Sequence, residues 1–132
     1  MLYLLDTNIL SDVIKNPQGV VANRMLALEE HDLLTSIIVA AEMRYGIEKK
    51  KSVVLSNRVE SLLKTIHVAS LDLDVDRIYG KIRMQLEQTG CVIGANDLLI
   101  AAHALFLDAI LVTDNTCEFK RIDRLKIENW LR

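Results

Sequence analysis

The amino-acid sequence predicts an α/β fold in which helices cover both faces of a central, mostly parallel sheet. The candidate strands are short and almost entirely apolar, and helical segments separate them along the chain. Strands buried on both faces are apolar throughout, and parallel strands need long crossover connections, which helices usually supply. The expected architecture is therefore a three-layer α/β/α sandwich.

Strands and helices are expected to alternate along the chain. Continuous apolar runs predict strands at Leu2–Leu5, Leu33–Ser36, His67–Leu71, Ile110–Thr113 and Lys126–Glu128. Helical periodicity predicts a short turn at Ser11–Lys15 and helices at Val20–Glu30, Ile37–Lys50, Val53–Thr65, Val75–Gln88 and Asp97–Leu107. The chain has one proline, no low-complexity segment and no internal repeat, so we expect a single domain over residues 1–132.

Composition favours a soluble, cytoplasmic protein. The apolar fraction is 51%, but no apolar run reaches the length of about 18 residues that a membrane span needs. The N-terminus lacks the basic segment and the small-residue cleavage site of a signal peptide. Cys91 and Cys117 lie far apart without metal-ligand spacing, which argues against a zinc site.

Overall charge excludes a protein that coats nucleic acid non-specifically. Sixteen Lys and Arg residues face eighteen Asp and Glu residues, which gives a net charge of −2. Any contact with nucleic acid must therefore be local. The candidates are Lys49, Lys50 and Lys51, and a second cluster formed by Lys120, Arg121, Arg124 and Lys126. Both clusters are equally typical of a solvated surface.

Two aspartates come directly after predicted strands. Asp6 follows Leu2–Leu5, and Asp114 follows Ile110–Thr113. Ligands of open α/β sheets bind beyond the carboxyl ends of the strands, which is where both side chains would lie. Each residue also has a structural interpretation, because aspartates commonly end strands in turns or cap helices.

Glu42 is unusual because its predicted helix places it on an apolar stripe. The apolar neighbours at helical spacing are Ile38, Val39 and Tyr45. An unpaired ionised group removed from water costs several kcal/mol, so Glu42 should be paired, protonated or bound to a cation. Arg44 or Arg83 could supply the partner, and the sequence leaves that possibility open.

Asp97 begins a predicted helix, where the helix dipole alone could explain an acid. Its neighbours Ala101 and Ala104 would let that helix approach the sheet closely. The four acids Asp6, Glu42, Asp97 and Asp114 would repel one another if the fold brought them together. Two unit charges about 4 Å apart repel by about 4 kcal/mol at an effective dielectric near 20. A divalent cation is the simplest remedy, and oxygen ligands favour Mg²⁺ or Mn²⁺ over zinc. Hydrolysis of a phosphodiester is the chemistry that this arrangement favours.

Five motifs in order carry a resemblance to a known family. They are LLDTNIL at Leu4–Leu10, AAEMRYGI at Ala40–Ile47, IGANDLLIAAHAL at Ile93–Leu105, LVTDNTCEF at Leu111–Phe119 and the closing IENWL. Together they span nearly the whole chain, which resembles the PIN-domain ribonucleases and, within them, the VapC toxins of type II toxin–antitoxin pairs.

The resemblance implies a magnesium-dependent endoribonuclease. Asp6 and Asp97 would be the principal metal ligands, and Glu42 would bind a metal or orient the attacking water. The fourth acid would be Asp114 or Glu118, and our first assignment is Asp114. The resemblance also implies the PIN-like fold, which agrees with the sandwich predicted above.

Several polar residues beside the acids have supporting roles under this interpretation. Thr7, Asn8, Thr113 and Asn115 could orient ligands through hydrogen bonds. Turn and cap chemistry explains the same residues equally well. His103 follows Asp97 by six residues, off its face, so we expect a structural role for it. We expect Trp130 to dock the C-terminal tail and Tyr45 and Tyr79 to pack helices.

The resemblance also implies partners. These are a VapB-type antitoxin that brings a basic side chain near Asp6 and Asp97, and a structured RNA such as a tRNA anticodon stem-loop. A homodimer through helices near Val20–Tyr45 and a toxin–antitoxin hetero-oligomer are expected, and no membrane. An aspartyl phosphotransferase is disfavoured because no Lys directly follows Thr113. The alternative function is a non-catalytic RNA- or partner-binding module of the same fold.

Overall fold

Five parallel strands form the central sheet of the computed structural model, which describes all residues from 1 to 132. The strands are β1 (Tyr3–Leu5), β2 (Leu33–Ser36), β3 (His67–Ala69), β4 (Ile110–Val112) and β5 (Ile127–Glu128). Their order in the sheet is β3-β2-β1-β4-β5, so β1 lies at the centre. Tyr3 pairs with Leu33 on one side and with Ile110 on the other. The predicted α/β class is confirmed.

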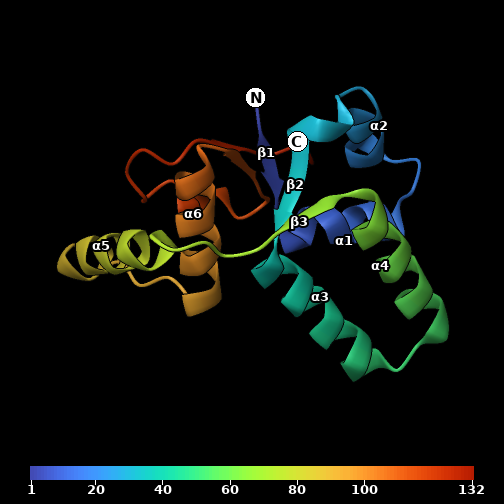
Figure 1. The fold of residues 1–132 in the computed structure, drawn as a ribbon, viewed down its shortest axis with the longest axis horizontal. Coiled ribbons are helices and arrows are strands. Elements are labelled where there is room, and N and C mark those ends of the chain that lie inside the picture. The colour runs from blue at the N-terminus through green and yellow to red at the C-terminus, as the bar shows by residue number, and fades with distance from the viewer.

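Seven helices surround this sheet and complete a three-layer sandwich. They are α1 (Thr7–Lys15), α2 (Val20–Leu26), α3 (Ile37–Lys50), α4 (Val53–Thr65), α5 (Val75–Gln88), α6 (Ala95–Leu107) and α7 (Thr116–Phe119). In Figure 1, α5 and α6 lie on one side of the strands, and α3 and α4 form a helical hairpin on the other. None of the helices combines the length and the hydrophobicity that a membrane-spanning segment requires.

Several predicted boundaries were wrong, and the causes are local. The first helix begins at Thr7 and not at Ser11, because the side chain of Asp6 accepts a hydrogen bond from the Thr7 backbone N–H and caps it. The second helix ends at Leu26, and a short 3-10 turn then leads into β2. Helix α6 begins at Ala95, so Asp97 lies in its first turn. Helix α7 was not predicted, and β3 ends at Ala69.

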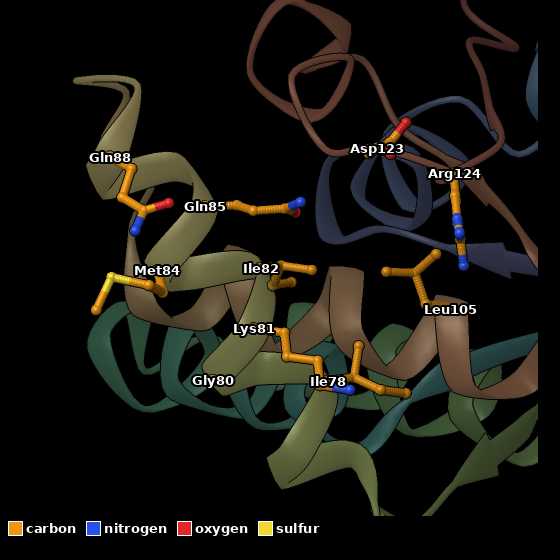
Figure 2. Close-up of a pocket in the computed structure, with 10 residues that line it drawn as sticks. All are labelled: Ile78, Gly80, Lys81, Ile82, Met84, Gln85, Gln88, Leu105, Asp123 and Arg124. Atoms are coloured by element: carbon orange, nitrogen blue, oxygen red, sulfur yellow. The ribbon is translucent and has the colours of Figure 1, made fainter.

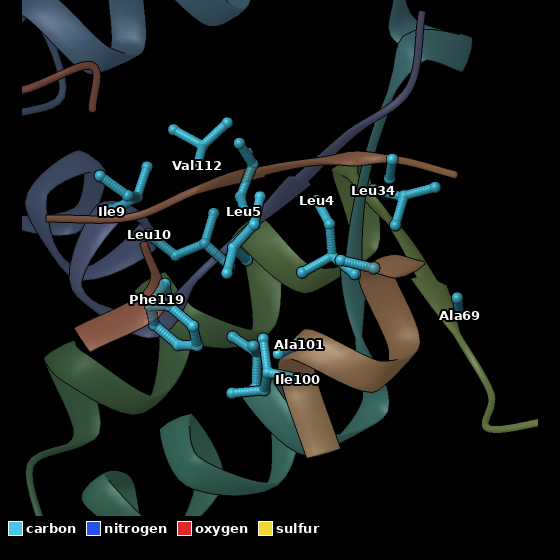
Figure 3. Close-up of a cluster of buried hydrophobic side chains, with 14 of the residues drawn as sticks. Leu4, Leu5, Ile9, Leu10, Leu34, Ala69, Ile100, Ala101, Val112 and Phe119 are labelled. Carbon is cyan, nitrogen blue, oxygen red and sulfur yellow. The ribbon is translucent and has the colours of Figure 1, made fainter. Parts of the chain in front are cut away.

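The hydrophobic core joins the sheet to the helices on both sides. Figure 3 shows Leu4 and Leu5 of β1 between side chains of α1 and of α6. Three alanines of α6 are completely buried: Ala101, Ala102 and Ala104. Small side chains let a helix pack close to its neighbours, so this core fixes the first turn of α6 near the end of β1.

The remaining aromatic and histidine predictions had mixed outcomes. Trp130 is 2% exposed and packs on Tyr3 with a ring-centroid distance of 5.3 Å, which confirms that it docks the C-terminal tail. Tyr45 is 65% exposed, so the prediction that it packs between helices was wrong. His103 is fully buried and its Nδ1 lies 2.8 Å from Ser36 Oγ, which fits a structural role.

Candidate active site

Asp6 is held at the carboxyl end of the central strand by contacts to three segments. Its backbone N–H donates to the carbonyl of Val112 at 2.9 Å, which extends the pairing of β1 with β4. Its Oδ1 accepts from the Thr7 N–H at 2.8 Å, and its Oδ2 accepts from Thr113 Oγ1 at 2.7 Å. The side chain is buried, and this burial raises its pKa despite both hydrogen bonds. Asp6 is therefore an N-cap and also a carboxylate with a fixed orientation.

Glu42 and Asp6 both accept hydrogen bonds from Thr7. The Thr7 hydroxyl donates to Glu42 Oε1 at 2.6 Å, so Thr7 contacts both acids, one through its backbone and one through its side chain. The Glu42 side chain is half-buried on α3, although Tyr45 does not belong to its apolar surroundings.

The arginines that could have neutralised Glu42 pair elsewhere. Arg44 pairs with Glu60, and Arg83 pairs with Glu87 at 3.0 Å. No basic side chain of the chain forms an ion pair with Glu42. An ion pair with either arginine is therefore not the explanation for Glu42 on this helix.

Asp97, in the first turn of α6, experiences the charges of three other acids. Its pKa is raised to about 6, first because the side chain is partly buried, and then because Asp6, Glu118 and Glu42 are negatively charged nearby. A hydrogen bond with Glu118 contributes in the same direction. We call the four carboxylates that share this region the acid group: Asp6, Glu42, Asp97 and Glu118.

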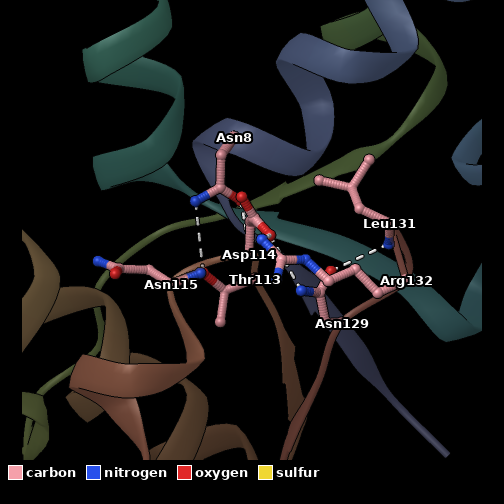
Figure 4. A network of polar contacts seen from close by, with 7 residues as sticks. All are labelled: Asn8, Thr113, Asp114, Asn115, Asn129, Leu131 and Arg132. Atoms are coloured by element: carbon pink, nitrogen blue, oxygen red, sulfur yellow. Dashed lines mark hydrogen bonds and ion pairs between the residues drawn. The ribbon is translucent and has the colours of Figure 1, made fainter.

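Asp114 lies outside the acid group, although it was our first assignment for the fourth acid. Its Oδ1 accepts from Asn129 Nδ2 at 3.0 Å and lies 3.4 Å from the guanidinium of Arg132 (Figure 4). It does not contribute to the raised pKa of Asp97, whereas Glu118 does. Of the two alternatives that the sequence left open, the geometry favours Glu118.

Short polar contacts tie the loop after β4 to the start of α1. Asn8 accepts from the Asp114 N–H at 3.0 Å and lies 3.4 Å from Thr113 Oγ1 (Figure 4). Thr113 Oγ1 also accepts from the Asn115 N–H at 3.0 Å, and Asn115 Nδ2 donates to Glu118 Oε2 at 3.0 Å. The predicted supporting residues therefore form turn contacts, and through them they also orient Asp6 and Glu118.

Asn129 and Arg132 are the residues of this region that the sequence did not single out. Both belong to the C-terminal segment, and Asn129 Oδ1 also accepts from the Leu131 N–H at 2.9 Å. A basic residue at a chain end is too common a feature to indicate such a contact. The C-terminal segment lies beside Asp114 because β5, which precedes it, pairs with β4.

The chemistry of the acid group fits a divalent cation. Every donor is a carboxylate oxygen, and no lysine or arginine pairs with any of the four acids. As they stand, no three Asp, Glu, His or Cys side chains are arranged closely enough to hold a metal ion. The pKa of Asp97 is nevertheless raised, first by burial and then by the negative charges of Asp6, Glu118 and Glu42. A hard cation such as Mg²⁺ or Mn²⁺ would compensate that charge with the oxygen ligands that it prefers.

A cavity larger than the one that Glu42 lines is separate from the acid group. It measures about 760 Å³ and lies between α5, Leu105 of α6 and the segment around Asp123 and Arg124 (Figure 2). None of the four acids lines it. Cavity size therefore does not identify the candidate site. The criterion that does is the concentration of negatively charged side chains.

The three lysines at the end of α3 lie in different surroundings. The ammonium of Lys49 lies over the ring of Tyr45, 5.4 Å from its centroid. Lys50 lines a smaller cavity together with Glu42. Lys51 caps the helix in a left-handed conformation with φ 51°. Only Lys50 of the three shares a cavity with the acid group.

Comparison with known proteins identifies the family of this chain. The PIN domain family matches residues 3–125. A protein of Rickettsia felis named ribonuclease VapC2 is 41% identical over 98% of both chains. A protein of Shigella flexneri named tRNA(fMet)-specific endonuclease VapC is 34% identical over 97% of both chains.

A solved structure is similar over almost the same range. The crystal structure of VapBC2 from Rickettsia felis, bound to a DNA fragment from its promoter, matches 98% of this chain and 99% of the other. The TM-score is 0.92 at 38% sequence identity. With its matching fold and full-length relatives, this chain belongs to the PIN domain family and, within it, to the VapC proteins.

Proposed function

We propose that this protein is a metal-dependent endoribonuclease and the toxin of a toxin–antitoxin pair. The observation that carries the proposal is the acid group, in which four carboxylates meet without a basic partner from the chain. The pKa of Asp97 near 6 expresses that crowding. The names of the relatives, ribonuclease VapC2 and tRNA(fMet)-specific endonuclease VapC, support the activity.

Asp6 and Asp97 are the proposed metal ligands, and Mg²⁺ is the proposed ion, with Mn²⁺ as a substitute. When bound, such an ion would acidify a water molecule and stabilise negative charge on the scissile phosphate. Asp6 is suited to this role because hydrogen bonds from Thr7 and Thr113 hold one of its oxygens each. Each oxygen keeps a further lone pair, and the fixed orientation reduces the entropy lost on binding.

Glu42 is proposed to orient the attacking water and to accept its proton. The Thr7 hydroxyl holds Oε1 at 2.6 Å, which leaves Oε2 for a second contact. Glu118 is proposed as the fourth acid, with Asn115 fixing its Oε2 at 3.0 Å. Asp114 is assigned a structural role, because Arg132 already neutralises it.

The proposed substrate is a structured RNA, with a tRNA anticodon stem-loop as the first candidate. The name of the Shigella flexneri relative supports tRNA as the class. RNA loops present unpaired nucleotides whose phosphates are accessible, which suits an acid group at the surface end of a sheet.

The proposed partner is a VapB-type antitoxin. The Rickettsia felis structure is a VapBC complex, which supports this assignment. A basic antitoxin side chain near Asp6 and Asp97 would compensate the same charge as the metal ion, and binding it would exclude the ion. Homodimerisation through the region from Val20 to Tyr45 stays a prediction, which the exposed Val20 and Leu26 support.

Incubation of the purified protein with tRNA tests the function. We expect cleavage with Mg²⁺, none with EDTA, and a loss of about 100-fold or more in Asp6→Asn and Asp97→Asn, since each removes a charged ligand. Asparagine retains the shape of the side chain, and at position 6 it also retains the capacity to cap α1.

Three outcomes would contradict the proposal. Cleavage that persists in EDTA or in both variants excludes the metal–carboxylate mechanism. RNA binding without cleavage under all conditions favours the non-catalytic binding module. Sequencing of the 5′ ends produced after brief expression in cells identifies the RNA and the bond that is cut, and ends outside tRNA exclude the proposed substrate.

A further inference from the structure

A second cavity opens directly beside the acid group. It measures about 240 Å³ and lies between α1 and the α3–α4 hairpin, which contact each other in the fold. Thr7 and Glu42 line it, and these are the residues joined by the 2.6 Å hydrogen bond of the site. Anything bound in this cavity would therefore lie next to the reacting phosphate.

Two lysines on opposite helices line the same cavity. Lys15 ends α1, and Lys50 ends α3. Both are exposed, and neither forms an ion pair or a hydrogen bond with another side chain. Arg44, on the same helix as Lys50, in contrast pairs with Glu60. Two free ammonium groups beside a cluster of carboxylates are available for an anion.

The inner wall of the cavity is apolar. Met43, Leu55 and Val59 line it, and Met43 and Val59 are buried in the core. An anion alone would not use such a wall. A nucleotide would use both parts, because its base is flat and apolar on its faces while its phosphate is charged.

Gly46 adds an independent observation. It lies within α3, where glycine is less favourable than alanine, and it lines the cavity. A Cβ at this position would meet no atom of the protein within 4 Å, and its φ is not positive. Nothing inside the chain therefore requires glycine here. The absent side chain leaves the helix backbone open to the cavity that Gly46 lines.

We propose that this cavity binds one unpaired nucleotide of the RNA next to the scissile phosphate. Its phosphate would lie between Lys15 and Lys50, and its base would pack on the apolar wall against the bare backbone at Gly46. This inference rests on the proposed function, since it names a subsite of the same reaction. It assigns a role to Lys50 alone within the cluster at the end of α3.

Binding of a labelled single-stranded RNA of mixed sequence tests the subsite. All proteins carry Asp97→Asn, so that the RNA stays intact, and Kd is measured over a range of salt concentrations. We expect Lys15→Ala and Lys50→Ala each to raise Kd by about 3- to 10-fold, and the double variant to reduce the salt slope by about 1.4. Lys49→Ala is the matched control on the neighbouring residue, with Kd expected within about 2-fold of the parent protein.

The variant Gly46→Ala distinguishes an effect on RNA binding from an effect on the stability of the fold. We expect it to raise the melting temperature by about 3 °C, since alanine favours the helix, and to raise Kd by about 3-fold or more because its methyl group enters the cavity. A variant that is more stable and binds worse cannot be explained by damage to the fold.

Unchanged Kd and salt slope in the lysine variants and in Gly46→Ala would overturn the inference. It would equally be overturned if these variants weakened only the complex with a VapB-type antitoxin, because the cavity would then belong to that protein. Cleavage of tRNA by the wild-type protein with Mg²⁺ is measured in parallel. If it cleaves and the variants bind normally, the subsite fails and the proposed function stands; if it does not cleave, the proposed function fails.

Discussion

Asp6 and Asp114 follow neighbouring strands of one sheet and meet opposite electrostatic surroundings. Asp6 is 4% exposed and lies among Glu42, Asp97 and Glu118, with no basic partner. The side chain of Asp114 is 39% exposed and pairs with Arg132 at 3.4 Å. Asp6 comes directly after β1 and Asp114 is the second residue after β4, so both lie at the same edge of the sheet while the compensation of their charges differs.

This difference separates a structural carboxylate from one that can bind a cation. Asp114 joins the C-terminal segment to the loop after β4, and its charge is already compensated within the chain. The acid group is held together by the fold despite its repulsion. Burial and like charge therefore distinguish the acid group from Asp114, whereas the strand pattern alone does not.

The largest expected effect is on the rate of cleavage, which should depend on the acid group and hardly on Asp114. Asp97→Asn should lower tRNA cleavage by about 100-fold or more, whereas Asp114→Asn should lower it by less than about 10-fold. Initial rates with saturating Mg²⁺ provide the measurement. An equal loss of cleavage rate in the two variants would show that Asp114 also takes part in catalysis.

Stability without metal should change with pH because of Asp97. Its pKa is about 6 in the folded protein against an ordinary value of 3.8, so the folded state binds more protons than the unfolded state between these values. The free energy of unfolding should therefore fall as pH rises from about 4 to about 6 and remain lower above that. Asp97→Asn removes this loss and should be more stable than wild type at pH 7.5 by at most about 2 kcal/mol, because Asp97 is only partly buried and solvent screens part of the repulsion.

Urea unfolding in EDTA at pH 4 and at pH 7.5 measures this prediction. The gain in Asp97→Asn should disappear at pH 4, where the wild-type carboxyl is protonated. Asp114→Asn is the comparison, and it should be no more stable than wild type at either pH, since it loses its contact with Arg132. A gain in Asp97→Asn that is equal at both pH values would exclude repulsion as the cause.

A smaller effect should distinguish Glu118 from Asp114 as the fourth acid. Glu118→Gln should lower the pKa of Asp97 below about 6, because the charge of Glu118 contributes to raising it. Asp114→Asn should leave that pKa unchanged. Titration of the Asp97 carboxyl by NMR without metal measures both, and the reverse pattern would contradict the assignment.

The smallest expected effect concerns Arg132. Its side chain is 78% exposed, and exposed ion pairs contribute about 1 kcal/mol or less. Arg132→Ala should therefore lower stability by less than about 1 kcal/mol and leave the affinity for Mg²⁺ unchanged. Isothermal titration and urea unfolding check the two parts, and weaker Mg²⁺ binding would show that the two regions are coupled.

The sequence predicted the fold because its strongest signals are local. The four predicted strands that begin at Leu2, Leu33, His67 and Ile110 correspond to β1 to β4, and helices α3, α4 and α5 have the predicted bounds. Helix α7 was missed because its four residues are too few for any periodicity. The early start of α1 was missed because it depends on the Asp6 cap.

The candidate site was only partly predictable for a different reason. Asp6, Glu42 and Asp97 were identified from acids in unexpected places, and the structure brings these three together. The choice between Asp114 and Glu118 depends on Arg132, which reaches Asp114 only after the chain has returned to the sheet. No local pattern contains that information, because it is a tertiary contact.

The central position of β1 also bears on protein synthesis. The strand that carries Asp6 is made first, yet it pairs with β4, and the acid group needs Glu118 near the end of the chain. A nascent chain on the ribosome therefore holds no complete acid group until almost all of it has been translated. Under the proposed function, we therefore expect an unfinished chain to be inactive, so that the antitoxin would be needed only for the finished one.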